Sequence, residues 1–145
     1  MTLLAGCGKA PQPPQPRPES QWVANATDVI DELQRDLELS SSTGDTVAEA
    51  RSALHDSGLY TILVAYTDFG GCRHMVRAVG APPAGFAEVV RTLHAACTKF
   101  ERAAALFTRA TTRSDPHALL AATRLADGAR PLLVRAREQL QAVGH

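Results

Sequence analysis

Apolar residues recur at spacings of three and four along most of the chain, which is the period of an amphipathic helix. The first such segment follows Ser20, a suitable N-cap residue, and is followed by the serine-rich residues 40–44. We therefore predict a first helix from Ser20 to about residue 40. Its apolar stripe is Val23, Ala26, Ile30, Leu33 and Leu37, and its expected solvated face is Asp28, Asp31, Glu32, Arg35, Asp36 and Glu38.

A second helix is predicted to begin at Thr46, because Thr46 and Glu49 have the spacing of a capping box. Gly58 interrupts the pattern, and residues 59–66 are then apolar almost all round. This run has the composition of a buried strand, but the chain offers no second strand to pair with it. We interpret it as the most buried part of the second helix. The helix should break near Gly70-Gly71, before a short amphipathic segment at residues 72–79.

Two further helices carry apolar residues in heptad spacing. Pro82-Pro83 should begin the third helix, and Ser114-Asp115-Pro116 should begin the fourth with a cap followed by proline. Pro131 lies inside the fourth helix and should kink it, because its ring removes a backbone hydrogen bond. The two stripes are Phe86, Val90, Leu93, Cys97, Phe100, Ala104 and Phe107, and Leu119, Ala122, Ala126, Ala129, Leu133, Ala136, Leu140 and Val143.

Four amphipathic helices with short connections predict an all-α fold, an antiparallel up-down-up-down four-helix bundle, at residues 20–145. A chain of 145 residues is long enough to bury a core in one domain. Its formal net charge is zero, so there is no net field to attract nucleic acid or an acidic membrane surface, and no nucleic-acid partner is expected. No cofactor is expected. No apolar run approaches the roughly 18 residues needed to span a bilayer.

The N-terminal sequence contains a short motif, Leu4-Ala5-Gly6-Cys7, followed by the proline-rich residues 11–18. The motif resembles the lipobox of bacterial lipoproteins. The resemblance implies cleavage before Cys7 and lipidation of its sulfur. It predicts that residues 1–6 are the remnant of a signal peptide and that residues 7–19 form a lipid-anchored, extended linker. The protein would then lie on the extracytoplasmic face of the cell membrane, attached to the membrane through lipid.

The other two cysteines, Cys72 and Cys97, form an even pair. In an oxidising compartment such a pair is typical of a disulfide, and both residues flank the connection around residues 80–82. Buried free thiols are the alternative for a reducing compartment. A metal site is a second alternative, because His94 and Cys97 are three residues apart on one helix face and His74 follows Cys72 closely. The candidate ligands are therefore Cys72, His74, His94 and Cys97.

Catalytic motifs are missing from the sequence. It has no Gly-x-Ser-x-Gly nucleophile elbow, no glycine-rich phosphate loop and no Glu-x-x-His motif of di-iron bundles. His55, His117 and His145 are expected to be solvated or partly packed side chains. We predict no catalytic residues. The expected function is non-catalytic binding or scaffolding at the cell envelope with an unknown protein or small-molecule partner, and the alternative is a metal-binding helical bundle.

Overall fold

The computed structural model describes residues 18–56 and 58–143, and the regular secondary structure in this part of the chain is all helical, without strands. The helices, in chain order, are α2 (Glu19–Ser40), the short 3-10 helix η1 (Ser41–Thr43), α3 (Val47–Leu54), α4 (Leu59–Gly70), α5 (Cys72–Ala78), α6 (Ala87–Arg113), α7 (Pro116–Asp127) and α8 (Arg130–Val143). The all-α prediction is confirmed for the described residues. The lipobox-like motif, most of the linker and His145 lie outside them.

Two of the predicted helix starts are correct in their chemistry. The Thr46 hydroxyl accepts a hydrogen bond from the Glu49 backbone N–H at 3.1 Å and so caps α3, as predicted. The Glu49 side chain reaches back to the Thr46 hydroxyl, which donates to Glu49 Oε1 at 2.9 Å. Asp115 accepts hydrogen bonds from the backbone N–H groups of His117 and Ala118, and Pro116 occupies the first turn of α7. These local contacts satisfy backbone donors that no helical carbonyl can reach.

The starts of α2 and α6 differ from the prediction. α2 begins at Glu19 with Pro18 as its N-cap residue, so Ser20 lies in the first turn. α6 begins at Ala87 rather than at Pro82-Pro83, which belong to the preceding connection. Gly85 explains this shift, because its φ of +93° lies in the left-handed region and cannot continue a right-handed helix.

The predicted second helix is divided into α3, α4 and α5. The first division lies between His55 and Gly58, where the Asp56 carboxylate accepts a hydrogen bond from the Gly58 N–H at 3.1 Å. The second lies at Gly70-Gly71, where a break was expected. α4 is therefore a helix of 12 residues with an interruption at each end.

The fourth predicted helix is also divided, into α7 and α8. The interruption lies at Gly128 and Ala129, so Pro131 is in the first turn of α8 and not at a kink inside one helix. Proline has no N–H, and it is tolerated where a helix begins because that donor would have no partner there. The expected kink is thus replaced by a helix boundary just before the proline.

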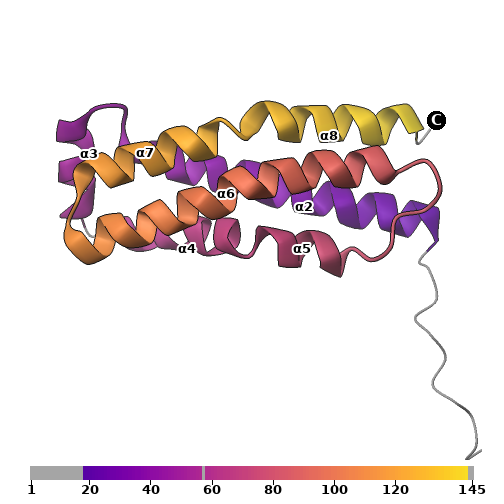
Figure 1. The fold of residues 1–145 in the computed structure, drawn as a ribbon, viewed down its shortest axis with the longest axis horizontal. Coiled ribbons are helices and arrows are strands. Elements are labelled where there is room, and N and C mark those ends of the chain that lie inside the picture. Colours follow the sequence, from indigo (N-terminus) through magenta and orange to yellow (C-terminus); the bar gives the residue numbers. More distant parts are fainter. Residues whose placement is uncertain (1–17, 57, 144–145) are drawn as a thin grey trace, which may run out of the picture.

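The helices form an elongated bundle (Figure 1). α2 runs its length, α3 lies at the end where α2 finishes, and α4 and α5 return alongside. α6 then runs back, and α7 and α8 follow it in the opposite direction. α6 packs against α4, α5, α7 and α8, whereas α2 packs chiefly against α4 and α8. The chain's two described ends lie at the same end of the molecule.

The core is built around aromatic stacks on the inward faces of α4 and α6. Phe69 stacks on Phe100 with ring centroids 4.5 Å apart, and Tyr66 stacks on Phe107 at 4.2 Å. All four side chains are buried. Near the other end of the bundle, the Trp22 indole N–H donates to the Gly80 carbonyl at 3.1 Å, which ties α2 to the α5–α6 connection. The predicted stripes lie mainly in this core, except that Val143 is exposed.

Candidate functional site

Cys72 and Cys97 form a disulfide that joins α5 to α6 in the structure, with their Cα atoms 5.2 Å apart. Both residues are completely buried. Beside them, the Arg73 guanidinium forms an ion pair with Glu101 and donates a hydrogen bond to the Thr98 hydroxyl at 2.8 Å. The covalent bond and these contacts fix a helix of only seven residues, α5, against the longest helix of the bundle.

The metal-binding alternative loses both sulfur ligands in this arrangement, since the two thiols are bonded to each other. Of the remaining candidates, His74 is exposed and His94 is partly buried. Across residues 18–56 and 58–143, no three His, Cys, Asp or Glu side chains gather as a metal site requires. Cys7 lies outside the described residues, so the structure does not bear on its lipidation.

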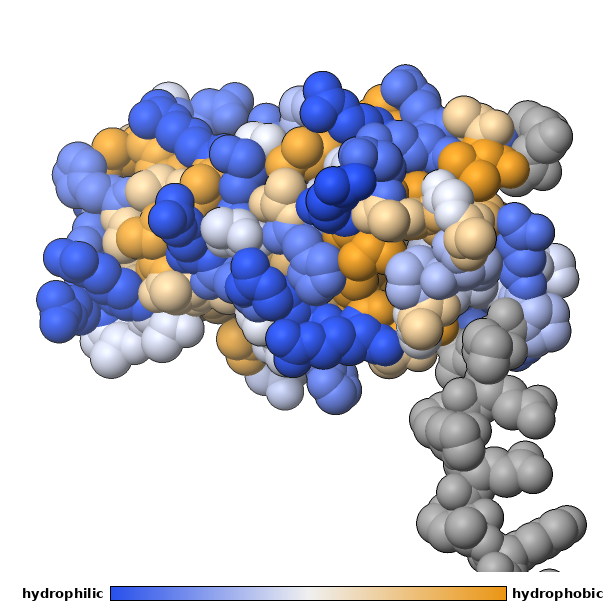
Figure 2. Space-filling model, turned by 45° about the vertical axis from the view of Figure 1, so that its right-hand side comes forward, coloured by the Kyte–Doolittle hydropathy of each residue, from blue (hydrophilic) through white to orange (hydrophobic). Residues whose placement is uncertain are grey.

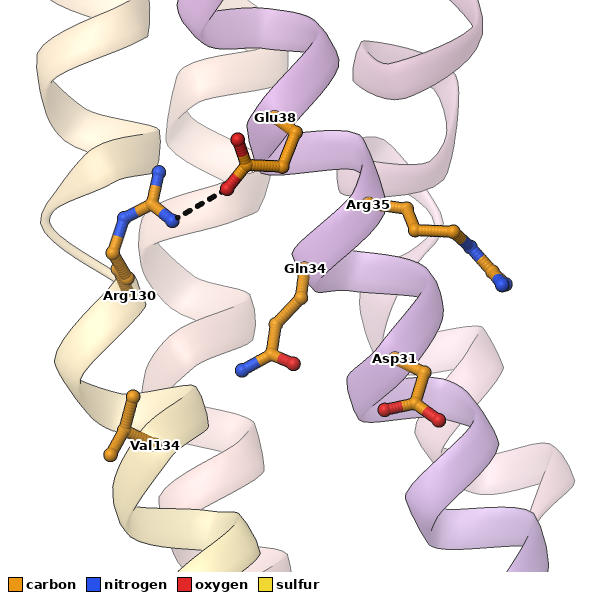
Figure 3. A pocket seen from close by; sticks show the side chains of 6 residues that line it. All are labelled: Asp31, Gln34, Arg35, Glu38, Arg130 and Val134. Atoms are coloured by element: carbon orange, nitrogen blue, oxygen red, sulfur yellow. Dashed lines mark hydrogen bonds and ion pairs between the residues drawn. The ribbon is translucent and has the colours of Figure 1, made fainter.

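A hollow of about 530 Å³ lies between α2 and α8. Its charged groups are largely paired with one another. Arg130 bridges Glu38 at 3.2 Å and Asp127 at 3.0 Å, whereas Arg35 points away to the other side of α2 (Figure 3). Two other lining residues, Asp31 and Gln34, are engaged by Arg137 of α8, which pairs with Asp31 and donates to the Gln34 side chain at 2.7 Å. These contacts hold α8 on α2 and leave no converging set of free polar groups for a ligand.

One face of α4 is apolar and exposed to solvent. We call this the α4 face, and it consists of Tyr60, Leu63, Val64 and Thr67. Tyr60 is 77% exposed, Leu63 44% and Val64 53%. The four residues follow the i, i+3, i+4, i+7 spacing of a single helical stripe. None of them is charged, and the only charged residue of α4 is Asp68.

A groove of about 400 Å³ runs beside the α4 face, between α4 and α6. Leu59, Tyr60 and Leu63 line it from α4, and Phe107 and Thr111 line it from α6. On the side drawn in Figure 2, hydrophilic residues are interspersed with apolar ones. The α4 face with its groove is thus an apolar surface of the kind that marks interaction sites in proteins.

The exposure of the α4 face overturns the prediction that residues 59–66 are the most buried part of the second helix. Only Ile62, Ala65 and Tyr66 of this run are buried. A 12-residue helix packed on α2 and α6 has room for one inward stripe, so the remaining apolar residues must face solvent. The sequence signal for this exposed face is that residues 59–66 contain no charged residue, so that no face of the helix is marked as the solvated one.

A second unexpected feature is a buried carboxyl group on α2. Asp36 on α2 is only 5% exposed. Its Oδ2 atom is buried and has no hydrogen-bond partner. Burial is the main cause that raises the pKa of Asp36 to about 8, and hydrogen bonding and charge repulsion from Asp68 raise it further.

Asp36 was expected on the solvated face of the first helix, and that assignment is wrong. The residue lies three positions after Leu33 and directly before Leu37, both of which are buried. On a helix this spacing places Asp36 beside the apolar stripe. The sequence signal was therefore its position, but the helices that pack over it could not be read from the same pattern.

Three hydroxyl groups form a further polar cluster in the core. The Thr43 and Thr123 hydroxyl oxygens are 2.7 Å apart, and the Tyr66 hydroxyl lies 3.5 Å from that of Thr123. Burial raises the pKa of Tyr66 to about 12, and the hydrogen bond with Thr123 opposes that shift. The cluster joins η1, α4 and α7 through satisfied polar contacts.

None of these groups has the arrangement of an acyl-transfer or hydrolytic site. Asp36 and Tyr66 remain protonated near neutral pH, and neither lines the hollow between α2 and α8 or the groove beside α4. Their contacts run between helices and serve packing. The α4 face and its groove are the candidate functional site, because they combine exposure, apolar chemistry and a concave surface.

Within the described residues, none of the helices combines the length and the apolar composition that crossing a bilayer requires. Comparisons of the chain with protein-family models, with curated proteins and with solved structures found no match.

Proposed function

We propose that the protein is a membrane-anchored extracytoplasmic lipoprotein whose antiparallel four-helix bundle is a non-catalytic binding module. The observation that carries the binding role is the α4 face, an uncharged stripe with three exposed apolar side chains beside an apolar groove. Exposing such residues is unfavourable in water, and soluble domains that do so commonly use the surface for contacts. In this bundle, α3, α4 and α5 together would form one member, and α7 and α8 together would form another.

The proposed occupant of the groove is an apolar helix of a protein partner in the cell envelope. Two adjacent helices, α4 and α6, form the walls of the groove, which suits the packing of a third helix between them. Tyr60 supplies an exposed aromatic ring, a residue type common at binding hot spots. The absence of charge on the α4 face favours a partner whose own contacting stripe is uncharged.

The proposed location rests on the lipobox-like Leu4-Ala5-Gly6-Cys7 and the proline-rich residues after it. The Cys72–Cys97 disulfide is in line with this location, because disulfides persist in oxidising compartments outside the cytoplasm. An acylated Cys7 would hold the bundle near the membrane, and the linker would set its distance from the membrane. The anchor and the α4 face would thus present a binding surface to other envelope proteins.

Site-directed photo-crosslinking in intact cells tests the binding role. We expect a photoreactive phenylalanine analogue at position 63 to give one discrete protein adduct whose crosslinked peptide is an amphipathic helix. The substitution Val64→Glu in the same chain should abolish that adduct, because it places a charge in the middle of the uncharged stripe.

The matched control is the same analogue at Val134 on α8, which is 45% exposed compared with 44% for Leu63. It should give no such adduct. Equal adducts at both positions, adducts to lipid alone, or an adduct that persists with Val64→Glu would contradict the proposal. An adduct between two copies of this chain would replace the proposed partner with self-association.

The anchor is tested by the substitution Cys7→Ala in the gene at its own chromosomal position. We expect the wild-type protein to enter the detergent phase in a phase-partitioning experiment and the variant to stay in the aqueous phase, because it lacks the acyl chains. Gln12→Ala, a change in the linker, should partition like the wild type. Equal partitioning of the wild-type and Cys7→Ala proteins would rule out the lipid anchor at this residue.

A further inference from the structure

The neutral net charge of the chain conceals an uneven distribution of charge. Acidic residues outnumber basic ones by ten to two in residues 18–70, whereas basic residues outnumber acidic ones by eleven to five in residues 71–143. The contrast is strongest between two helices: α2 has six acidic residues and one basic residue, and α6 has five basic residues and two acidic ones. Zero net charge therefore leaves room for a strong local field, and such asymmetry suggests contact with a charged surface.

The fold places α2 and α6 on opposite sides of the bundle. Both helices pack against α4 and α8, and they have little contact with each other. In Figure 1, α2 passes behind α6. The charges of the two helices therefore face away from each other instead of cancelling locally, and the surface of α6 presents a positive field of its own.

The outward side of α6 carries a line of exposed residues that we call the basic stripe. These residues follow one another at alternating spacings of four and three, which places them on a single face of the helix. The basic stripe consists of Arg91, Ala95, Thr98, Arg102, Ala105, Arg109 and Thr112, all of them exposed. The residues between the arginines are small and uncharged, so the stripe contains no carboxylate to offset its charge.

The two acidic residues of α6 lie off the basic stripe. Glu101 pairs with Arg73 and so faces α5. Glu88 pairs with Arg91 in the first turn of α6, and the side chain of Arg91 is still 70% exposed. The positive charge of the remaining stripe is therefore not neutralised by the helix that carries it.

The guanidinium groups in the second half of α6 remain available to a partner. Among the residues that the structure describes, Arg102 and Arg113 take part in no ion pair, and Arg113 is exposed beside the stripe. Arg109 approaches Asp115 only at 3.9 Å, and its side chain is 57% exposed. These three side chains are free to bind anionic groups without first breaking a short contact within the bundle.

We propose that the basic stripe docks the bundle on a membrane surface of anionic phospholipids. Guanidinium groups bind phosphate through two parallel hydrogen bonds, and an anionic membrane attracts basic side chains that come within about one screening length. The alanine and threonine residues of the stripe are short, so the longer arginine side chains reach a flat surface first. α6 has 27 residues and is about 40 Å long, so contact along it lays the bundle on its side.

A second copy of the chain fits the basic stripe less well than a membrane does. Its α2 is acidic, but the exposed Arg35 interrupts the exposed carboxylates Asp28 and Glu32. Two further carboxylates of α2, Asp31 and Glu38, are already paired with arginines of α8. A membrane is also the surface that a lipid-anchored bundle would meet, and this choice of partner rests on the proposed function.

The basic stripe and the α4 face use different residues. The groove beside α4 is lined from α6 by Phe107 and Thr111, and neither of them belongs to the stripe. A bundle docked through the stripe therefore keeps the residues of the α4 face for a protein partner. The stripe would set the orientation of the bundle on the membrane, which a lipid anchor on a linker does not set.

Vesicle sedimentation of the full chain carrying Cys7→Ala tests the basic stripe, because this variant has no acyl chain with which to bind lipid. We expect binding to vesicles of equal parts phosphatidylglycerol and phosphatidylcholine, and none to vesicles of phosphatidylcholine alone. Raising the salt concentration from about 0.1 M to about 1 M should release the protein, since the screening length falls from about 10 Å to about 3 Å.

The double substitution Arg102→Gln and Arg109→Gln should weaken binding to the anionic vesicles by more than about tenfold, since each basic side chain near such a surface contributes about fivefold. Glutamine has a helix propensity close to that of arginine, so α6 stays folded. The matched control is Arg51→Gln with Arg124→Gln, which removes the same charge from exposed positions on α3 and α7 and should bind like the parent. Equal losses for the two double variants, or equal binding to both kinds of vesicle, would overturn the proposal.

Photo-crosslinking on the same vesicles reports which side of the bundle docks. A photoreactive phenylalanine analogue at Ala105, in the middle of the stripe, should give lipid adducts, and the analogue at Ala24, an exposed alanine of α2, should give none. Equal lipid adducts at both positions, or adducts between two chains in place of lipid at position 105, would contradict docking through α6. Because these experiments contain no acyl anchor and no protein partner, their failure leaves the proposed function unaffected, and failure of crosslinking at position 63 in cells leaves the stripe unaffected.

Discussion

Replacing Phe100 with alanine is expected to destabilise the folded protein by about 3–5 kcal/mol. Phe100 is completely buried on α6, and its ring stacks on Phe69 of α4 at a centroid distance of 4.5 Å. Truncation removes the apolar contacts of the ring and leaves a cavity that the neighbouring helices fill only in part. Urea unfolding at pH 6 should show a lower midpoint with a similar dependence on denaturant concentration.

Tyr60 on α4 is the matched aromatic control, because it is 77% exposed. Tyr60→Ala should change stability by no more than about 0.5 kcal/mol. The conservative change Phe100→Leu should cost less than Phe100→Ala, since much of the buried volume remains. A loss for Tyr60→Ala as large as that for Phe100→Ala would show that α4 is not packed as described.

Reduction of the Cys72–Cys97 disulfide is the second change with a large expected effect. The two cysteines are 25 residues apart in sequence, and opening a loop of this size lowers stability by about 3–4 kcal/mol on the chain-entropy model. The bond restricts the unfolded chain, so its loss favours unfolding even where the folded contacts persist. Denaturation in the presence and absence of dithiothreitol, in a Cys7→Ala background, measures this difference.

The control is the double substitution Cys72→Ala and Cys97→Ala, which should be insensitive to dithiothreitol and resemble the reduced protein in stability. Equal midpoints for the oxidised and reduced wild type would show that the bond does not form or does not stabilise the fold. Titration of free thiols before reduction distinguishes these two cases, since the oxidised protein should expose none from Cys72 or Cys97 after denaturation.

The candidate site illustrates where periodicity stops being informative. In residues 59–66 every face is apolar, so no contrast between apolar and polar positions remains to say which side turns inward. The packing of α4 on α2 and α6 decides which side turns inward. It buries Ile62, Ala65 and Tyr66 and leaves Leu63 and Val64 exposed to solvent. Exposure of the α4 face is thus a property of the assembled bundle.

Asp36 shows the same limit for a polar residue. A single aspartate beside an apolar stripe is ordinarily placed on the solvated edge of a helix, because burying a charge is costly. Its burial is set by the helices that pack on α2, chiefly α4 and α8. Local spacing carries no information about which helices pack there, so the burial of Asp36 could not be predicted from the sequence.

By itself, the sequence determined the helical class, the apolar stripes, the capping of α3 and α7 and the break at Gly70-Gly71. It also gave the pairing of Cys72 with Cys97 as one of a few options for these cysteines. These features depend on residues close in sequence, or on a choice among very few thiols. Only the tertiary structure decided that α4 turns an apolar face outward, that Asp36 is buried, and that the chain before Pro131 is a helix boundary. The reason is that each depends on which helices pack together, and that choice minimises the exposed apolar area of the whole bundle rather than of any one segment.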